Sequence, residues 1–156
     1  MITVNYSTMI EMPHSQAWQL LADLSVPQHY VPGVTSTEIT TDISRGEGAS
    51  RLVFLMGLLP LRETVSHWQE GQGFTISLGL KNRALPFPIK HAFFRYNIEP
   101  LADETVISNS LDFQFSWLWL DKTIGVISKP IVKMILWKIT TNMKRFYLSR
   151  QSVATT

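Results

Sequence analysis

Hydrophobic and polar residues alternate along most of the chain, which is the pattern of strands with one buried face. The first alternating segment covers residues 2 to 11 and ends before Pro13. Six more follow, at residues 34 to 42, 49 to 56, 61 to 70, 73 to 81, 89 to 99 and 104 to 117. Because the connections between these six are short and carry turn residues, consecutive strands are expected to pair as an antiparallel meander.

Helical periodicity replaces the alternation in two places. After the first strand, Ser15 is a suitable N-cap for a short helix, Pro27 ends it, and residues 28 to 31 allow one more helical turn. The chain then closes with a long helix from Asp121 to Arg150. This order predicts an α+β domain in which the helices pack on one strongly bent, seven-stranded antiparallel sheet.

The closing helix carries a broad apolar arc. At about 100° per residue, Ile124, Ile131 and Ile135 lie at the centre of an arc of roughly 200°, with lysines on the opposite side. Pro130 is expected to kink the helix or to mark the junction with a short leading turn. So wide an arc indicates that the helix lies in a concave partner, such as a curved sheet, that contacts more than one of its sides.

Composition narrows the class of protein. With 156 residues, 45% hydrophobic and 17% charged, the chain has the size of one globular domain, which we assign to residues 1–150, with 151–156 as a disordered tail. It contains no cysteine, which excludes disulfides and thiolate catalysis. No signal peptide or membrane-spanning run is evident, and a cytoplasmic location is therefore expected.

Charge is distributed unevenly. Residues 117 to 150 contain seven Lys or Arg and one acid, Asp121, although the net charge of the whole chain is only +2. The lysines are spread over four turns without interleaved arginine and aromatic residues, so a solvated helix face is favoured and no nucleic-acid partner is expected. Peripheral contact with an anionic membrane stays open.

Three motifs resemble a known superfamily. They are Pro13-x-x-x-Ala17-Trp18-x-x-Leu21-x-Asp23, the entry to the second strand at Val31-Pro32-Gly33-Val34, and the closing helix rich in Lys and Ile. Together with the element order, they resemble the START-like (SRPBCC, Bet v 1-like) superfamily, in particular its polyketide cyclase/dehydrase and lipid-transport branch. The resemblance implies a helix-grip fold, in which the sheet curls around the last helix and leaves an apolar cavity between them.

Strand faces suggest which residues would line such a cavity. In the last strand, Ile107, Leu111 and Phe113 share the inner face with a lone amide, Asn109, and the preceding strand places Tyr96 inward. Lys138, on the edge of the apolar arc, could snorkel to water or meet the carboxylate of a fatty-acid-like ligand. The predicted ligand-binding set is Phe54, Met56, Val65, His67, Ile76, Leu78, Phe94, Tyr96, Asn109, Leu111, Phe113, Ile131, Ile135 and Lys138.

Groups that could transfer protons are few. If Glu63, Val65 and His67 form the inner face of their strand, Glu63 and His67 enter the cavity about 13 Å apart, too far to act on each other. With Tyr96 they are the candidate catalytic residues, and for each the alternative is a polar group satisfied within the protein. The four histidines lack metal-ligand spacing and no dinucleotide fingerprint is present, so neither a metal nor a cofactor is predicted.

In a meander, alternate loops emerge at the same end, and one end of this domain is far more apolar than the other. We assign the cavity mouth to that end, with the loops packing over the core or forming a homodimer as the alternative. The predicted mouth residues are Tyr30, Leu58, Leu59, Leu85, Phe87, Trp117 and Trp119.

Three functions fit these features. The first is binding or transport of a hydrophobic small molecule, such as a lipid, isoprenoid or polyketide, in the cavity. The second is an aromatic cyclase or dehydratase that uses Glu63, His67 and Tyr96. The third is an interaction module that uses the basic helix or the apolar loops.

Overall fold

The computed structural model describes residues 1–56, 60–80, 85 and 88–154. Its elements follow the predicted order, with one addition, the short helix α2. They are β1 (Ile2–Ile10), α1 (His14–Leu21), the 3-10 helix η1 (Pro27–His29), β2 (Val34–Ile39), β3 (Ser50–Leu55), β4 (Leu61–Gln69), β5 (Gly73–Leu80), β6 (Ile89–Leu101), β7 (Glu104–Phe115), α2 (Leu118–Lys122) and α3 (Ile124–Ala154).

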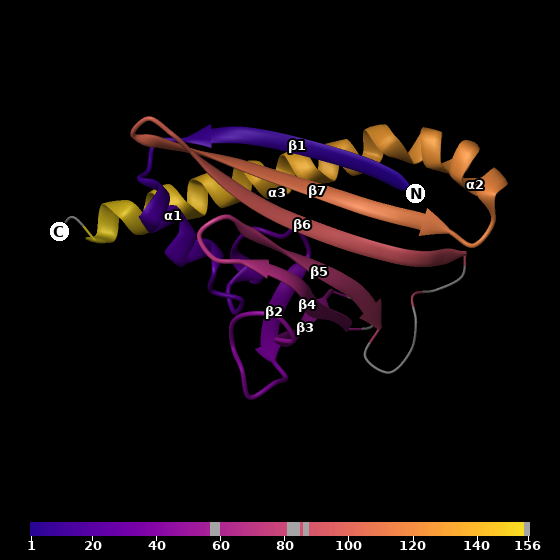
Figure 1. Ribbon diagram of the computed structural model, residues 1–156, viewed down its shortest axis with the longest axis horizontal. Coiled ribbons are helices and arrows are strands. Elements are labelled where there is room, and N and C mark those ends of the chain that lie inside the picture. Colours follow the sequence, from indigo (N-terminus) through magenta and orange to yellow (C-terminus); the bar gives the residue numbers. More distant parts are fainter. Residues whose placement is uncertain (57–59, 81–84, 86–87, 155–156) are drawn as a thin grey trace.

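The seven strands form one antiparallel sheet in the order β1-β7-β6-β5-β4-β3-β2. Strands β2 to β7 are the predicted meander, and β1 adds to its far edge by pairing with β7 from Ile2↔Phe113 to Ile10↔Thr105. The sheet twists strongly, so that β2, β3 and β4 turn away from the long strands β1, β7 and β6 (Figure 1). The predicted α+β helix-grip architecture is confirmed.

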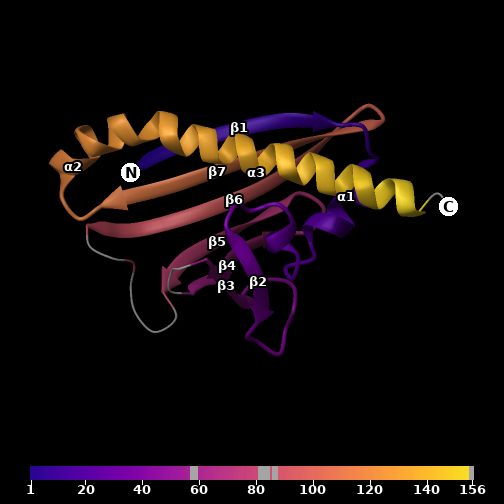
Figure 2. The same cartoon turned by 180° about the vertical axis from the view of Figure 1, so that it is seen from behind.

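Helix α3 runs along the length of the sheet and covers β1 and β7 rather than the middle strands (Figure 2). Its second half provides the buried contacts, through Leu136, Ile139, Met143 and Tyr147, none of which is more than 4% exposed. Asn109 on β7 donates a hydrogen bond from Nδ2 to Thr140 Oγ1 at 2.9 Å. The lone amide of the inner face thus ties the helix to the sheet.

The same half of α3 is also held from the side of η1. Phe146 stacks on the ring of His29 with 4.9 Å between ring centroids, and Asn142 Nδ2 donates to the carbonyl oxygen of Tyr30 at 3.1 Å. Sheet and η1 therefore contact two sides of the helix, as the broad apolar arc predicted, but only beyond about residue 135.

The first half of α3 differs from the sequence prediction. Ile124, Ile131 and Ile135, expected at the centre of the buried arc, are 46%, 56% and 47% exposed. Because the helix packs over β1 and β7 at the edge of the sheet, the sheet covers only one side of this half. The apolar arc is therefore wider than the part of the helix that the sheet covers. Pro130 lies inside α3, and the helix continues past Arg150 to Ala154, into the segment expected to be a disordered tail.

None of the helices in the described part of the chain combines the length and apolar character needed to cross a bilayer.

The start of β5 lies very close to β6. A Cβ atom added to Gly73 would lie 2.1 Å from the carbonyl oxygen of Tyr96, a backbone atom that cannot move aside. At Gly71, where φ is +75°, an added Cβ would meet no atom within 4 Å. Glycine is thus required at position 73 by contact and at position 71 only by its backbone conformation.

We expect Gly73→Ala to lower the free energy of unfolding by about 3 kcal/mol or more, because the strands must separate at Tyr96. Gly71→Ala is the matched control and should cost only about 1–2 kcal/mol, the cost of a left-handed backbone. Urea unfolding of both variants measures the difference. Equal losses would contradict the close approach of β5 and β6.

Candidate functional site

A cavity of about 170 Å³ lies between the sheet and the middle of α3. It exists because α3 covers β1 and β7, which leaves the inner face of β4, β5 and β6 opposite the helix without filling the space between them. Its walls are Leu61, Glu63, Leu78, Phe94, Tyr96 and Leu111 from the sheet, Val132, Ile135, Leu136 and Ile139 from α3, and Val31. Ile135 is the most exposed of these lining residues, at 47%.

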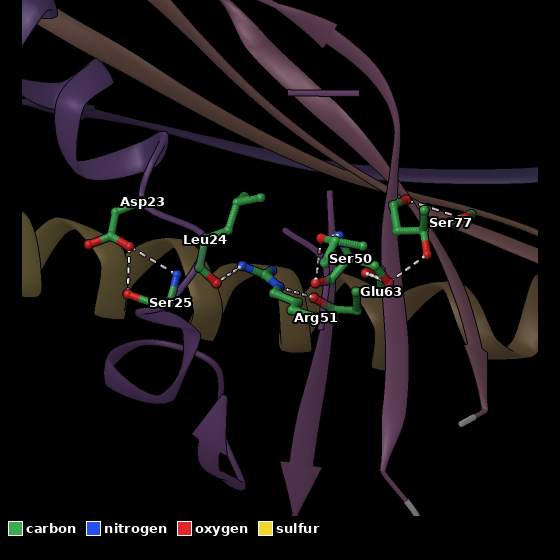
Figure 3. Close-up of polar contacts among 9 residues, drawn as sticks. Asp23, Leu24, Ser25, Ser50, Arg51, Glu63 and Ser77 are labelled. Atoms are coloured by element: carbon green, nitrogen blue, oxygen red, sulfur yellow. Dashed lines mark hydrogen bonds and ion pairs between the residues drawn. The ribbon is translucent and has the colours of Figure 1, made fainter. Parts of the chain in front are cut away.

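Among these lining residues, only Glu63 and Tyr96 have polar side chains. Glu63 is paired with Arg51 of the neighbouring strand β3, with 2.6 Å between Arg51 Nε and Glu63 Oε2. Arg51 Nη1 also donates to the carbonyl oxygen of Leu24 at 2.8 Å, so the guanidinium spans from the chain after α1 to β4 (Figure 3). The pair is enclosed, with 2% of the Arg51 side chain and 12% of the Glu63 side chain exposed.

Burial decides the protonation of the tyrosines beside this pair. It raises the pKa of Tyr30 to about 12 and the pKa of Tyr96 well above its ordinary value, although the positive charge of Arg51 opposes both shifts. Burial by itself would lower the pKa of Arg51, but the charge of Glu63, the neighbouring Tyr96 and Tyr30 and the hydrogen bond to Glu63 together outweigh burial and raise that pKa. At neutral pH the cavity therefore presents a phenol and a carboxylate whose charge is compensated by arginine.

The structure brings part of the predicted ligand-binding set together. Leu78, Phe94, Tyr96, Leu111 and Ile135 line the cavity, and so does the candidate Glu63. A second group lies in the core without lining the cavity. It comprises Val65, Ile76, Asn109 and Phe113, which are buried, and Phe54, which is partly buried.

The remaining predicted contacts lie in solvent. Met56 is 79% exposed, Ile131 is 56% exposed, and Lys138 is also exposed. None of them lines the cavity. Lys138 in particular is too solvated to neutralise a carboxylate bound inside.

His67 is on the opposite face from the one predicted, because β4 contains a bulge. Val65 pairs with Ile76 but His67 pairs with Thr75, so Ser66 is an extra residue and the alternation shifts by one. The His67 side chain is 66% exposed, with Nδ1 3.5 Å from Glu47 Oε1, while Trp68 turns toward the core and stacks on Phe74. Glu63 and Tyr96 remain as the candidates for proton transfer in the cavity.

The predicted mouth residues do not form one opening. Tyr30 is buried, and Leu85 is partly buried and packs against the core. Trp117 and Trp119 stack on each other and line a separate open groove of about 650 Å³, together with Lys90 and Lys122. Leu58, Leu59 and Phe87 lie outside the described residues.

The important residue that sequence reasoning missed is Arg51. The predicted strand bounds, 49 to 56 and 61 to 70, would pair residue 51 with residue 66, whereas the structure has the register Arg51↔Glu63. An arginine directly across from a glutamate on an inward-facing position indicates a buried ion pair. Within the described residues, no cluster of His, Asp and Glu could hold a metal ion.

Comparisons with known proteins agree with this geometry. The profile of the family described as polyketide cyclase / dehydrase and lipid transport matches residues 1–146. The fold is similar to the crystal structure of Ara h 8.0201, with a TM-score of 0.67 and 14% identity over 94% of this chain and 97% of the other. No curated protein matches significantly.

Two bacterial structures are comparably similar. One is an uncharacterised protein from Bacillus thuringiensis, with a TM-score of 0.66 and 14% identity over 94% of this chain and 98% of the other. The second is XoxI from Bacillus cereus, with a TM-score of 0.63 and 14% identity over 97% and 99%. At this level of identity the likeness concerns the fold alone.

Replacing Arg51 by methionine should lower the free energy of unfolding by about 3–5 kcal/mol, because it leaves Glu63 charged without its partner. The double variant Arg51→Met/Glu63→Gln should recover most of this loss, since no unpaired charge remains. Urea unfolding of Arg51→Met, Glu63→Gln and the double variant completes a double-mutant cycle. If the two single losses of unfolding free energy simply added up in the double variant, a direct interaction between Arg51 and Glu63 would be contradicted.

Stability should fall at alkaline pH. The folded pKa of Tyr30 is raised to about 12, above the value of about 10 in an unfolded chain, so its contribution is complete below pH 10 and is lost as the pH rises toward 12. Tyr30→Phe should make the decrease of the unfolding free energy between pH 10 and 11.5 shallower. An unchanged slope in that variant would show that Tyr30 ionises as freely in the folded protein as in the unfolded chain.

Proposed function

Because the chain belongs to the polyketide cyclase / dehydrase and lipid transport family, we propose that it binds or carries a small, neutral, hydroxyl-bearing apolar molecule. The ligand occupies the cavity between the sheet and the middle of α3. The observation that carries the proposal is an apolar cavity whose two polar lining groups, Glu63 and Tyr96, lie beside the charge-compensating Arg51.

The size of the cavity limits the ligand. A dry apolar cavity of about 150 Å³ is sufficient for a benzene ring, and the cavity here has about 170 Å³. One or two rings, or the end of a longer isoprenoid or polyketide, therefore fit inside, and a longer chain would leave past Ile135. Each 100 Å² of apolar ligand surface that is buried contributes about 2.5 kcal/mol to binding.

The polar groups limit its chemistry. A hydroxyl can donate to the Glu63 carboxylate and accept from the Tyr96 phenol, which satisfies both without adding charge. Arg51 Nη2 is buried without a hydrogen-bond partner among the described residues, but the single positive charge of Arg51 is already balanced by Glu63. A carboxylate would add a second negative charge beside Glu63, and burying this uncompensated charge is unfavourable. An alcohol or phenol is thus favoured over a fatty acid.

We expect 2-naphthol to bind saturably, with one site per chain. The measurement is the displacement of the fluorescent probe N-phenyl-1-naphthylamine. Its carboxylate counterpart, 2-naphthoate, should bind at least tenfold more weakly at pH 7.5. Glu63→Gln should reduce this preference because it removes the like charge. Equal binding of the two compounds would contradict the proposed role of Glu63.

A matched pair of Leu→Trp variants locates the site. Leu111→Trp fills the cavity and should abolish displacement, whereas Leu101→Trp, at a half-exposed position near the β6–β7 turn, should leave it unchanged. Loss in both variants, or in neither, would reject the cavity as the binding site.

A further inference from the structure

Several large apolar side chains are exposed on α2 and on the first half of α3. We call this set the outer apolar face and define it as Leu118, Trp119, Ile127, Ile131, Met134 and Trp137. Leu118 is 77% exposed and Ile127 is 71% exposed. Exposed apolar surface of this extent on one helical segment is typical of a docking surface.

Helix geometry places this face away from the protein. At about 100° per residue, Ile127, Ile131 and Met134 lie on the side of α3 opposite to the buried Leu136, Ile139 and Met143. Among the described helices and strands, none lies in front of α3 in Figure 2. Beyond residue 137 the same side becomes polar, with Lys138 and Arg145, so the outer apolar face ends within the helix.

The charges around the face are positive. Lys90 and Lys122 line the groove together with Trp117 and Trp119, and Lys133 is exposed one helical turn before Trp137, at the edge of the outer apolar face. The one acid between residues 117 and 150, Asp121, is already engaged, by the N-terminal ammonium at 3.4 Å and by the backbone N–H of Phe115 at 3.0 Å. The surface thus combines apolar residues, tryptophans at both ends and uncompensated lysines.

This combination matches an anionic lipid surface. A helix that lies in the membrane interface buries an apolar face into the acyl boundary, places Trp at headgroup level and directs Lys toward the anionic headgroups. A second copy of the chain is a poorer partner, because a symmetric contact would bring the lysines of both copies together without carboxylates between them. An anionic lipid surface can cover the apolar residues and neutralise the lysines at the same time.

We propose that α2 and the first half of α3 dock onto anionic membranes through the outer apolar face and its flanking lysines. This inference is independent of the proposed ligand, since the face lies on the outer side of α3 and the cavity on the inner side. The two meet only at Ile135, which lines the cavity and is exposed beside the face. Docking would therefore bring the opening of the cavity close to the bilayer.

The full chain should co-float with vesicles of phosphatidylcholine and phosphatidylglycerol at 0.1 M salt, and much less with vesicles of phosphatidylcholine alone. Lys122→Gln/Lys133→Gln should lower the partition coefficient about fivefold for each lysine, and wild-type binding should weaken in high salt. Ile127→Ser/Met134→Ser should lower it more than tenfold. These side chains are already exposed, so the variants should unfold at the same urea concentration as the wild type.

Two control variants make the same kinds of substitution away from the outer apolar face. Leu101→Ser removes an exposed leucine near the β6–β7 turn, and Arg62→Gln removes an exposed charge from β4; both should bind vesicles like the wild type. Equal partition into the two vesicle types, or no effect of the Ile127→Ser/Met134→Ser change, would overturn the proposal. So would a dimer in sedimentation velocity that this double variant dissociates, because the face would then be a contact between copies.

Discussion

The structure depends on how the second half of α3 is held. Leu136, Ile139, Met143 and Tyr147 are buried against the sheet, and the burial of each large apolar side chain contributes about 1.5–3 kcal/mol. The stack of Phe146 on His29 and the Asn142 hydrogen bond fix the other side of the helix. Within the described residues, no equivalent contacts hold the first half across β4, β5 and β6. The cavity under the middle of α3 and the exposed apolar face of its first half are two consequences of one asymmetric attachment.

The Arg51–Glu63 pair gives this apolar space its chemical character. Enclosing two charges is costly, and the same volume of hydrophobic side chains would often be at least as stable. The pair is therefore better explained by specificity than by stability. It places one compensated carboxylate in the wall of the cavity, next to the phenol of Tyr96, whose pKa burial holds well above its ordinary value. Such a wall can orient one hydroxyl and disfavours an added negative charge.

Sequence patterns predicted the fold well and the site only in part, for physical reasons. Alternation with a period of two located all seven strands and placed Tyr96, Leu78 and Leu111 in the cavity wall, because side-chain direction follows from local geometry. The same rule failed for His67, because the bulge at Ser66 is fixed by pairing with β5 and leaves no mark in β4 itself. The periodicity of α3 showed which residues are apolar but not which side the sheet would cover, since that depends on where the helix lies across the strands.

The second half of α3 is buried and its first half is exposed, with Ile135 between them. If the first half docks onto a bilayer as proposed, a ligand could pass between the bilayer and the cavity at Ile135. The claim on which this account rests most directly is that the ligand lies inside, between the sheet and α3. In methyl-labelled protein, nuclear Overhauser effects from bound 2-naphthol should reach the methyl groups of Leu78, Leu111 and Ile139. Contacts to Ile127 or Met134 alone, with none to those three, would place the ligand outside the cavity and contradict the account.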